Sequence, residues 1–229
     1  MKKIALFILP ILMVSHIFAI AGFGIQLGQN TFSVEESTKS LVEDYVILKN
    51  GAFENSYNVG GYVYIDAIPV VDLELDFNFQ GQTYDINFEN QLGEMDPLPF
   101  GWVSTDLYFT ARKKILGLGI PFLAKAKLFA GVGYNTHMTT PIANKEMLTG
   151  LCDNDLLNCD PSNLDSALED YMTDKDNYIS SSGYHLQGGL QFKVLMLDTF
   201  LFYRHVMVKD VVPDANGYGS LNLRLGLGI

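Results

Sequence analysis

Alternation of apolar and polar residues is the dominant pattern along this chain. In residues 70–80 (VVDLELDFNFQ), every second residue from Val71 to Phe79 is aliphatic or aromatic, and those between are acids or amides. Alternation of this kind predicts a β-strand with one apolar face. The same pattern predicts strands over residues 23–28, 59–67, 102–112, 122–132, 184–194 and 220–229. An eighth strand is predicted over 199–209 (TFLFYRHVMVK), although both of its faces are largely apolar.

The connections between these strands alternate in length. Short connections are expected at Ile68–Pro69, residues 114–121 (KILGLGIP) and residues 196–198, with Pro69 and Pro121 in turns. Long ones cover residues 31–57, 81–99 and 140–177, and the connection at 210–217 is intermediate. Short turns at one end and long polar loops at the other are typical of outer-membrane barrels.

The first long connection has two interpretations. Ser33 and Glu36 have the spacing of a helix capping box, and apolar residues from Val34 to Tyr45 follow at helical spacing. The alternative is a short extra hairpin through Tyr45 to Leu48.

The residue types on the two faces decide which way the barrel is turned. The polar faces are rich in Gly, Ser, Gln, Asn and Tyr, whereas the exposed surface of a soluble barrel is usually rich in Lys and Glu. The apolar faces are mainly long side chains, which would pack poorly inside a small closed barrel. The sequence therefore predicts an all-β fold, an eight-stranded antiparallel up-and-down transmembrane β-barrel with short periplasmic turns and long extracellular loops. A soluble exported ligand-binding barrel is the alternative, with its apolar faces inward.

An inverted barrel places charged side chains in its lumen, where they are tolerated when they are paired. Arg204 is assigned inward because an arginine facing lipid near the bilayer midplane costs ~2–4 kcal/mol. The predicted lumen network contains acids and bases in nearly equal number: Asp66, Asp72, Glu74, Asp76 and Asp106 with Arg112, Lys125, Lys127, Lys193, Arg204 and Arg224.

The N-terminus has the pattern of a secretory signal peptide. A short basic start at Lys2 and Lys3 precedes an apolar run, and Ala19-Ile20-Ala21 fits a cleavage site. The apolar run is too short for the ~20 residues of a transmembrane helix. We therefore expect residues 1–21 to be a signal peptide and residues 22–229 to form the barrel domain, exported to a bacterial outer membrane.

Charge and cysteine content narrow the function further. The 208 residues after the signal contain 13 basic and 26 acidic residues, which makes nucleic acid a poor partner. Cys152 and Cys159 lie close together in an exported chain, which favours a local disulfide over a metal site. The acidic stretch that begins at Asp153 lacks the glycine and glutamate of an EF-hand loop, and a solvated loop is the favoured interpretation.

Aromatic residues near strand ends give a weak further signal. Two interfacial girdles of aromatic residues are typical of membrane barrels, whereas ordinary strand propensity would also place tyrosines there. The candidates for such girdles are Tyr62, Trp102, Tyr134, Tyr178, Tyr184 and Tyr218.

One group of residues raises the question of catalysis. His185 lies near Ser181 and Asp176 in the sequence, and alternation places Ser181 and His185 on the same inward face. A lipid-modifying barrel enzyme would use such a nucleophile and base. We favour a polar lumen lining instead, and expect no enzyme activity, catalytic residue, cofactor or metal.

The signal peptide, eight alternating strands, alternating connections and terminal segment YGSLNLRLGLGI resemble the eight-stranded outer-membrane β-barrel family, similar to the OmpA transmembrane domain and OmpX. The resemblance covers nearly all of the chain after the signal. It implies a membrane anchor that presents loops, with outer-membrane lipid and the barrel-assembly machinery as partners, and we expect a monomer with at most a narrow pore. The family's assembly signal maps onto Gly219, Leu223, Leu225, Leu227 and Ile229, although Ile229 stands where the family usually ends in an aromatic residue.

Overall fold

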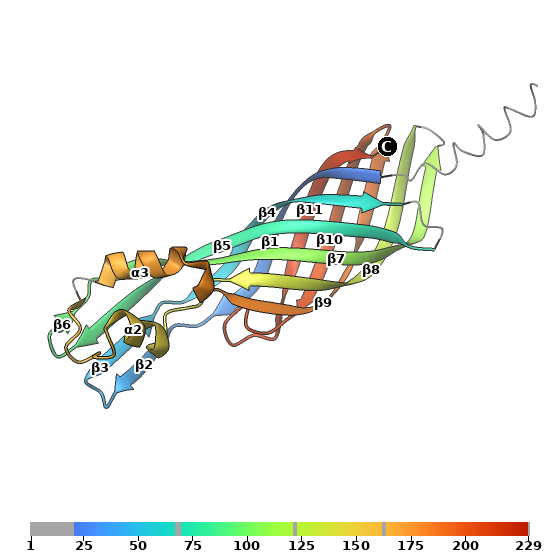
Figure 1. Ribbon diagram of the computed structural model, residues 1–229. Helices are drawn as coiled ribbons and strands as arrows, with labels where there is room; N and C mark the ends of the chain where they lie inside the picture. Colours follow the sequence, from blue (N-terminus) through green and yellow to red (C-terminus); the bar gives the residue numbers. More distant parts are fainter. Residues whose placement is uncertain (1–20, 67–69, 121–122, 162–163, 229) are drawn as a thin grey trace, which may run out of the picture.

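Eight antiparallel strands form a closed ring (Figure 1). A computed structural model of the protein describes residues 21–66, 70–120, 123–161 and 164–228. The predicted signal peptide, the turns at Pro69 and Pro121, and Ile229 lie outside these residues, apart from Ala21. In ring order the strands are β1 (Ala21–Val34), β4 (Phe53–Ile65), β5 (Asp72–Asn90), β7 (Leu98–Ile120), β8 (Ala124–Thr139), β9 (Ile179–Val194), β10 (Leu197–Met207) and β11 (Gly217–Gly228), which pairs with β1.

The strand register makes the barrel narrow. A path of paired residues that starts at Ala21 on β1 passes once round the ring and returns to β1 at Thr31, a stagger of ten residues. Closure with a stagger requires tilted strands, typically by about 35–45°, and eight strands leave an interior just wide enough for side chains. The lumen is therefore a packed core.

The outside of the ring is apolar. Outward-facing side chains are about half exposed, including Phe23 (54%), Val132 (57%) and Leu225 (45%). The polar residues between them are buried, among them Gln26, Asp76 and Arg224. This confirms the inverted barrel predicted from the alternation, and it contradicts the soluble alternative with apolar faces inward.

The structure shows which face of β10 points into the lumen, a point that the sequence did not decide. Phe200, Phe202 and Arg204 point inward and are almost fully buried, whereas Leu201 and Tyr203 are about half exposed on the outside. Arg204 inward is confirmed. The two phenylalanines share the inward face because they pack against interior rings and guanidinium groups.

Beyond one end of the ring, the long connections fold into a compact cap (Figure 1). The cap comprises the extended ends of β5 and β7, the helices α2 (Lys145–Leu151) and α3 (Leu164–Thr173), the 3-10 turn η2 (Lys175–Asn177), and the short strands β2 (Ser37–Val42), β3 (Val46–Asn50) and β6 (Gly93–Glu94). The other end of the ring carries the short turns.

The predicted helix in the first long connection is wrong, and the alternative hairpin is correct. β2 and β3 pair with each other, and β3 also pairs with β5. Glu43 (φ 36°) and Asp44 (φ 65°) form the turn in left-handed backbone. Leu41, Val46 and Leu48 are buried in the cap, so tertiary packing overrides the helical spacing.

A second correction concerns residues 114–121, which were expected to be a turn. β7 continues to Ile120 and pairs with β8 as far as Ala124, with a bulge between Lys114 and Leu116. Apolar and glycine residues alternate here as well, which is why the segment stays in the sheet.

Within the described residues, no helix has the length and apolar character needed to cross a membrane.

The exterior makes a quantitative prediction. Leu201 on β10 lies between Leu190 and Leu223 in neighbouring strands and is 46% exposed. Leu201→Arg is expected to lower the unfolding free energy in lipid bilayers by ~2–4 kcal/mol, because the charge faces hydrocarbon. Urea titration measures the effect. Leu92→Arg in the cap, at a residue that is 58% exposed, is the control and should change stability by less than ~0.5 kcal/mol. Equal stability of the two variants would contradict the exterior assignment.

Candidate functional site

The centre of the lumen is an ion-pair network that joins opposite walls of the barrel. Arg224 on β11 lies 3.1 Å from Glu74 and also pairs with Asp76, both on β5. Arg204 on β10 pairs with Asp76 as well, and Arg112 on β7 lies 2.9 Å from Glu74. The side chains of all five are at most 1% exposed. The predicted pairing of lumen acids and bases is present here.

Amide side chains extend this network. Gln187 accepts hydrogen bonds from Arg204 at 2.8 and 3.0 Å and donates one to Glu74 at 2.6 Å. Gln26 accepts from Arg224 at 2.6 Å and donates to Asn78 at 3.0 Å. These amides are not part of the predicted network, although they occupy the same inward face as the predicted charges.

Aromatic rings flank each guanidinium group. The Arg204 guanidinium lies 4.0 Å from the ring centre of Tyr108, and that of Arg224 lies 4.4 Å from Phe202. Arg112 lies 4.9 Å from Phe200. A desolvated cation over a ring face is stabilised by roughly 2 kcal/mol, which partly offsets the loss of hydration.

A second group of charged side chains, here called the second tier, lies in the lumen toward the short-turn end of the barrel. Asp66 accepts hydrogen bonds from Arg112 and Lys127, each at 3.0 Å, and Asp72 lies 3.6 Å from Arg112. Lys125 and Lys193 face each other across β8 and β9 but form no ion pair with a carboxylate in the described part of the chain. Those two predicted network members are therefore not brought into it by direct contact.

Asp198 is a buried acid that lies in the short connection predicted over residues 196–198. It is fully buried on β10, accepts two hydrogen bonds of 2.9 Å from Gln191, and accepts another from Tyr64. Its position two residues before Phe200 on the same face was the available signal. Counted with Asp198, the predicted lumen acids and bases among the described residues are equal in number, six of each.

The third tier, toward the cap, corrects the role predicted for Asp106. This carboxylate meets no lysine or arginine in the described residues. It lies 2.7 Å from Nδ1 of His137, and it accepts hydrogen bonds from Ser104 at 2.7 Å and Gln80 at 2.8 Å. Tyr108 and Tyr218 close the tier through a hydroxyl contact of 3.0 Å. Neutral donors therefore supply most of the hydrogen bonds that the Asp106 carboxylate accepts.

The arrangement that could suggest a catalytic triad is not assembled. His185 is buried on the inward face, as predicted, but its partners are Thr110 at 2.9 Å and Asn135 at 3.5 Å. Ser181 lies opposite His137 in the strand register, and Asp176 belongs to η2 in the cap. The favoured interpretation of His185 as lumen lining fits these contacts.

The aromatic girdle is only partly present. Tyr134 (42% exposed) and Tyr184 (67% exposed) stand on the outer wall with ring centres 5.9 Å apart. Tyr62, Trp102 and Tyr218 are at most 3% exposed and point inward, so their girdle assignment is wrong. All three occupy the inward face of their strands, which cannot be inferred from their residue type alone.

The cap contains its own apolar core. Its buried residues include Leu48 and Phe88 from strands and Met147, Leu148 and Leu168 from helices. Asn144 caps α2 by accepting a hydrogen bond of 3.0 Å from the backbone N–H of Met147. In the acidic stretch that was predicted to be a solvated loop, Asp153 and Asp155 are exposed, whereas Leu156 beside them is buried in this apolar core.

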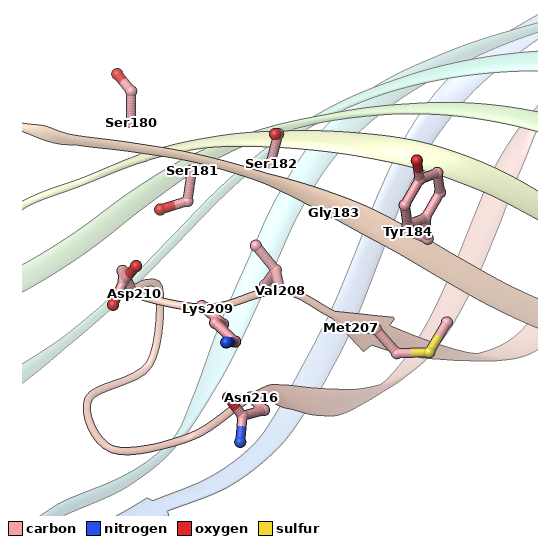
Figure 2. A pocket seen from close by; sticks show the side chains of 10 residues that line it. All are labelled: Ser180, Ser181, Ser182, Gly183, Tyr184, Met207, Val208, Lys209, Asp210 and Asn216. Carbon is pink, nitrogen blue, oxygen red and sulfur yellow. The ribbon is translucent and has the colours of Figure 1, made fainter.

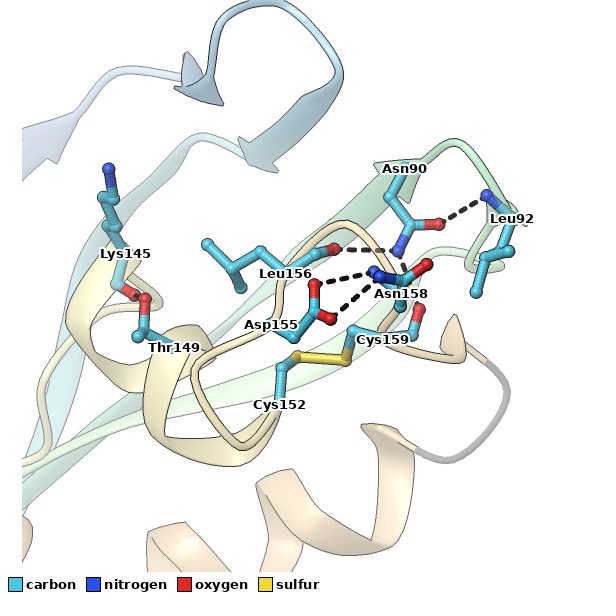
Figure 3. Close-up of a disulfide and its surroundings, with 9 residues drawn as sticks. All are labelled: Asn90, Leu92, Lys145, Thr149, Cys152, Asp155, Leu156, Asn158 and Cys159. Carbon is cyan, nitrogen blue, oxygen red and sulfur yellow. Dashed lines mark hydrogen bonds between the residues drawn. A yellow bond between two sulfur atoms is a disulfide. The ribbon is translucent and has the colours of Figure 1, made fainter.

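Cys152 and Cys159 form the predicted disulfide in this cap (Figure 3). Asn90 at the end of β5 donates hydrogen bonds to the carbonyls of Leu156 (3.0 Å) and Cys159 (2.7 Å). These hydrogen bonds fasten the disulfide loop to the end of β5. Hydrogen bonds from the side chain and backbone of Asn158 hold the pKa of the exposed Asp155 below its ordinary value.

Among the described residues, no group of three or more His, Cys, Asp or Glu side chains is arranged to hold a metal ion. Of the predicted assembly signal, Leu223, Leu225 and Leu227 face outward on β11 and are 42–45% exposed, and Gly219 is buried. Their role in assembly stays a prediction.

No protein-family model matches this chain, and no curated protein matches it in sequence. Solved structures with similar chain paths include Ail, the attachment invasion locus protein of Yersinia pestis (10% identity, 92% of this chain and 99% of that chain covered, TM-score 0.38). Others are the N-terminal β-barrel domain of Pseudomonas aeruginosa OprF (10%, 91% and 97%, 0.38) and the outer membrane protein OprG from Pseudomonas aeruginosa (9%, 92% and 94%, 0.41). The closed ring of eight antiparallel strands gives the chain the architecture of an eight-stranded outer-membrane barrel.

The central network predicts a large effect for a single substitution. Arg224→Gln leaves Glu74 and Asp76 short of a buried partner and is expected to lower the unfolding free energy by ~3–5 kcal/mol. Lys49→Gln, which removes contacts of 3.7 Å to exposed Glu89 and Glu94, should cost less than ~1 kcal/mol. Adding Glu74→Gln to Arg224→Gln restores the charge balance and should recover part of the loss. Denaturant titration of the folded barrel distinguishes these cases, and an additive double variant would contradict the coupling.

The disulfide makes a separate prediction for the cap. Replacing both Cys152 and Cys159 by Ser should cost ~2 kcal/mol of cap stability, as estimated for releasing a short loop. Limited proteolysis of residues 152–161 should therefore become faster, while the folded barrel resists as before. Wild-type protein with reductant should behave like the double variant. An unchanged cleavage rate would show that the apolar core alone holds the loop.

Proposed function

We propose that this chain is a non-enzymatic integral outer-membrane protein whose barrel anchors a folded cap at the cell surface. The observation that supports this best is the continuous apolar exterior around a lumen filled with buried, paired charges. Lipid is the environment that such an exterior fits, since the eight strands pair with one another around a closed ring, which satisfies the backbone groups at the paired positions. The cap would then serve envelope integrity or surface interaction.

Two features argue against transport and catalysis as the main role. Trp102, Arg112, Arg204, Phe200 and Phe202 are among the largest fully buried side chains and fill the interior. A porin leaves a water-filled channel by using 16–18 strands, about twice the number here. The two inward histidines have other partners, His185 with Thr110 and His137 with Asp106, so a lipid-modifying enzyme is the weaker proposal.

The orientation can be tested with single cysteines. Leu92→Cys lies in the cap, and Met196→Cys lies in the short turn at the opposite end; the native residues are 58% and 55% exposed. A membrane-impermeant maleimide should label the first in intact cells and the second only after lysis. Wild-type protein, whose cysteines are bonded, is the blank. The reverse pattern would overturn the surface location of the cap.

Membrane integration has an independent test. The protein should be found in the outer-membrane fraction, and unheated samples should migrate differently from boiled samples on SDS gels because closed barrels keep their fold in detergent. Planar bilayers should show no porin-sized conductance. A soluble periplasmic protein whose band does not shift on heating would overturn the proposal.

A further inference from the structure

The barrel wall opens between β9 and β10 on the side of the cap. These strands pair from Val194 and Leu197 up to Tyr184 and Met207, where their pairing ends. β9 continues to Ile179 while paired with β8 alone. Alternate residues of this edge direct backbone N–H and C=O groups away from β8, as at any strand edge.

The other side of the opening is held apart by the cap. Asp210 adopts left-handed backbone (φ 62°), and Val211 and Val212 turn inward and are buried in the cap core. Trp102 donates a hydrogen bond of 3.2 Å from Nε1 to the carbonyl of Val211. The connection therefore cannot follow β9 without breaking these contacts, and the opening is part of the folded structure.

Gly183 lies at the point where β9 and β10 begin to separate. A Cβ atom at this position would lie 2.1 Å from the carbonyl oxygen of Met207. Only glycine allows the two backbones to meet here before they separate.

Figure 2 shows the resulting cleft, whose volume is about 540 Å³. Ser180, Ser181 and Ser182 lie on the β9 side, and Lys209 and Asp210 lie on the opposing connection. At its base, Tyr184 (67% exposed) and Met207 (39% exposed) continue the apolar exterior of the barrel. A second cleft of about 400 Å³ shares Lys209, Asp210 and Asn216 and extends to Trp102.

We propose that this cleft binds a membrane lipid with a zwitterionic head group that carries one phosphate and one ammonium. Lys209 and the hydroxyls of Ser180 and Ser182, which share one face of β9, supply donors for the phosphate, and Asp210 supplies a carboxylate for the ammonium, so the charges of site and head group are complementary. The acyl chains lie along Tyr184 and Met207. The inference rests on the membrane location proposed above.

Native mass spectrometry of the full-length folded protein in detergent provides the binding test. The probes are short-chain phospholipids of equal chain length with phosphoethanolamine or phosphoglycerol head groups, and inorganic phosphate. We expect one phosphoethanolamine lipid to be retained in preference to the phosphoglycerol lipid. Displacement of this lipid by millimolar inorganic phosphate would reveal an ion site and overturn the proposal, as would equal retention of both lipids.

Variants locate the site. Lys209→Gln should weaken retention of the phosphoethanolamine lipid about tenfold through loss of a charge-assisted hydrogen bond. Asp210→Asn, which tolerates the left-handed backbone, should remove the preference between the two head groups. Lys175→Gln, at an exposed lysine in η2, is the matched control and should bind like wild type. Equal affinity of the Lys209 and Lys175 variants would overturn the site.

A lipid with a photoreactive acyl chain completes the test. Crosslinks are expected at Tyr184 or Met207, and crosslinks confined to other parts of the wall would overturn the proposal. The same samples are run unheated on SDS gels. A retained heat shift without specific lipid binding would refute this inference alone, whereas loss of the shift in the wild type would refute the membrane barrel itself.

Discussion

The buried contacts of Arg112, Arg204 and Arg224 with Glu74 and Asp76 are the constraint on which the rest of this barrel depends. Arg204 and Arg224 join β5 to strands on the far side of the ring, whereas Arg112 lies on the neighbouring strand β7, so no local hairpin can satisfy the whole network. Desolvation of five ions is costly, and the network stabilises the fold only when every partner is present. Closure of the ring and completion of the network are therefore coupled. The flanking aromatic rings and glutamines follow from the same need to replace lost water.

Along β5, the inward-facing side chains change from polar in the ring to apolar in the cap. On β5, the inward side chains are Glu74, Asp76, Asn78 and Gln80 within the ring and Tyr84, Ile86 and Phe88 within the cap. The inward residues stay at every second position along the whole strand, and only the environment around the strand changes. Where lipid lies outside, apolar residues face out and polar residues fill the interior. Where water lies outside, the interior becomes apolar. On this strand, residues 81–83 separate the polar interior of the ring from the apolar interior of the cap.

The sequence was sufficient for the eight strands, their order and their inverted faces, because period-two alternation is a local signal repeated in every segment. It was insufficient for the cap, since the packing of Leu48 against residues of α2 and α3 depends on contacts distant in sequence. Residue type also misled: Trp102 and Tyr218 were assigned to an outer girdle although their position in the alternation is inward. Asp198 and His137 were missed as partners because charge was considered without the neutral groups that satisfy it.

Trp102 connects the two parts of the molecule. Its ring lies 5.2 Å from that of Phe32, which also contacts Phe53 and Tyr218, and this aromatic layer sits between the polar lumen and the apolar cap. Exclusion of water at this layer keeps the local dielectric low, which strengthens the paired charges beneath it. A lumen filled in this way fits the proposed anchor better than an open channel. It leaves the cap and the wall, including the place where β9 and β10 part, as the surfaces for the proposed interaction.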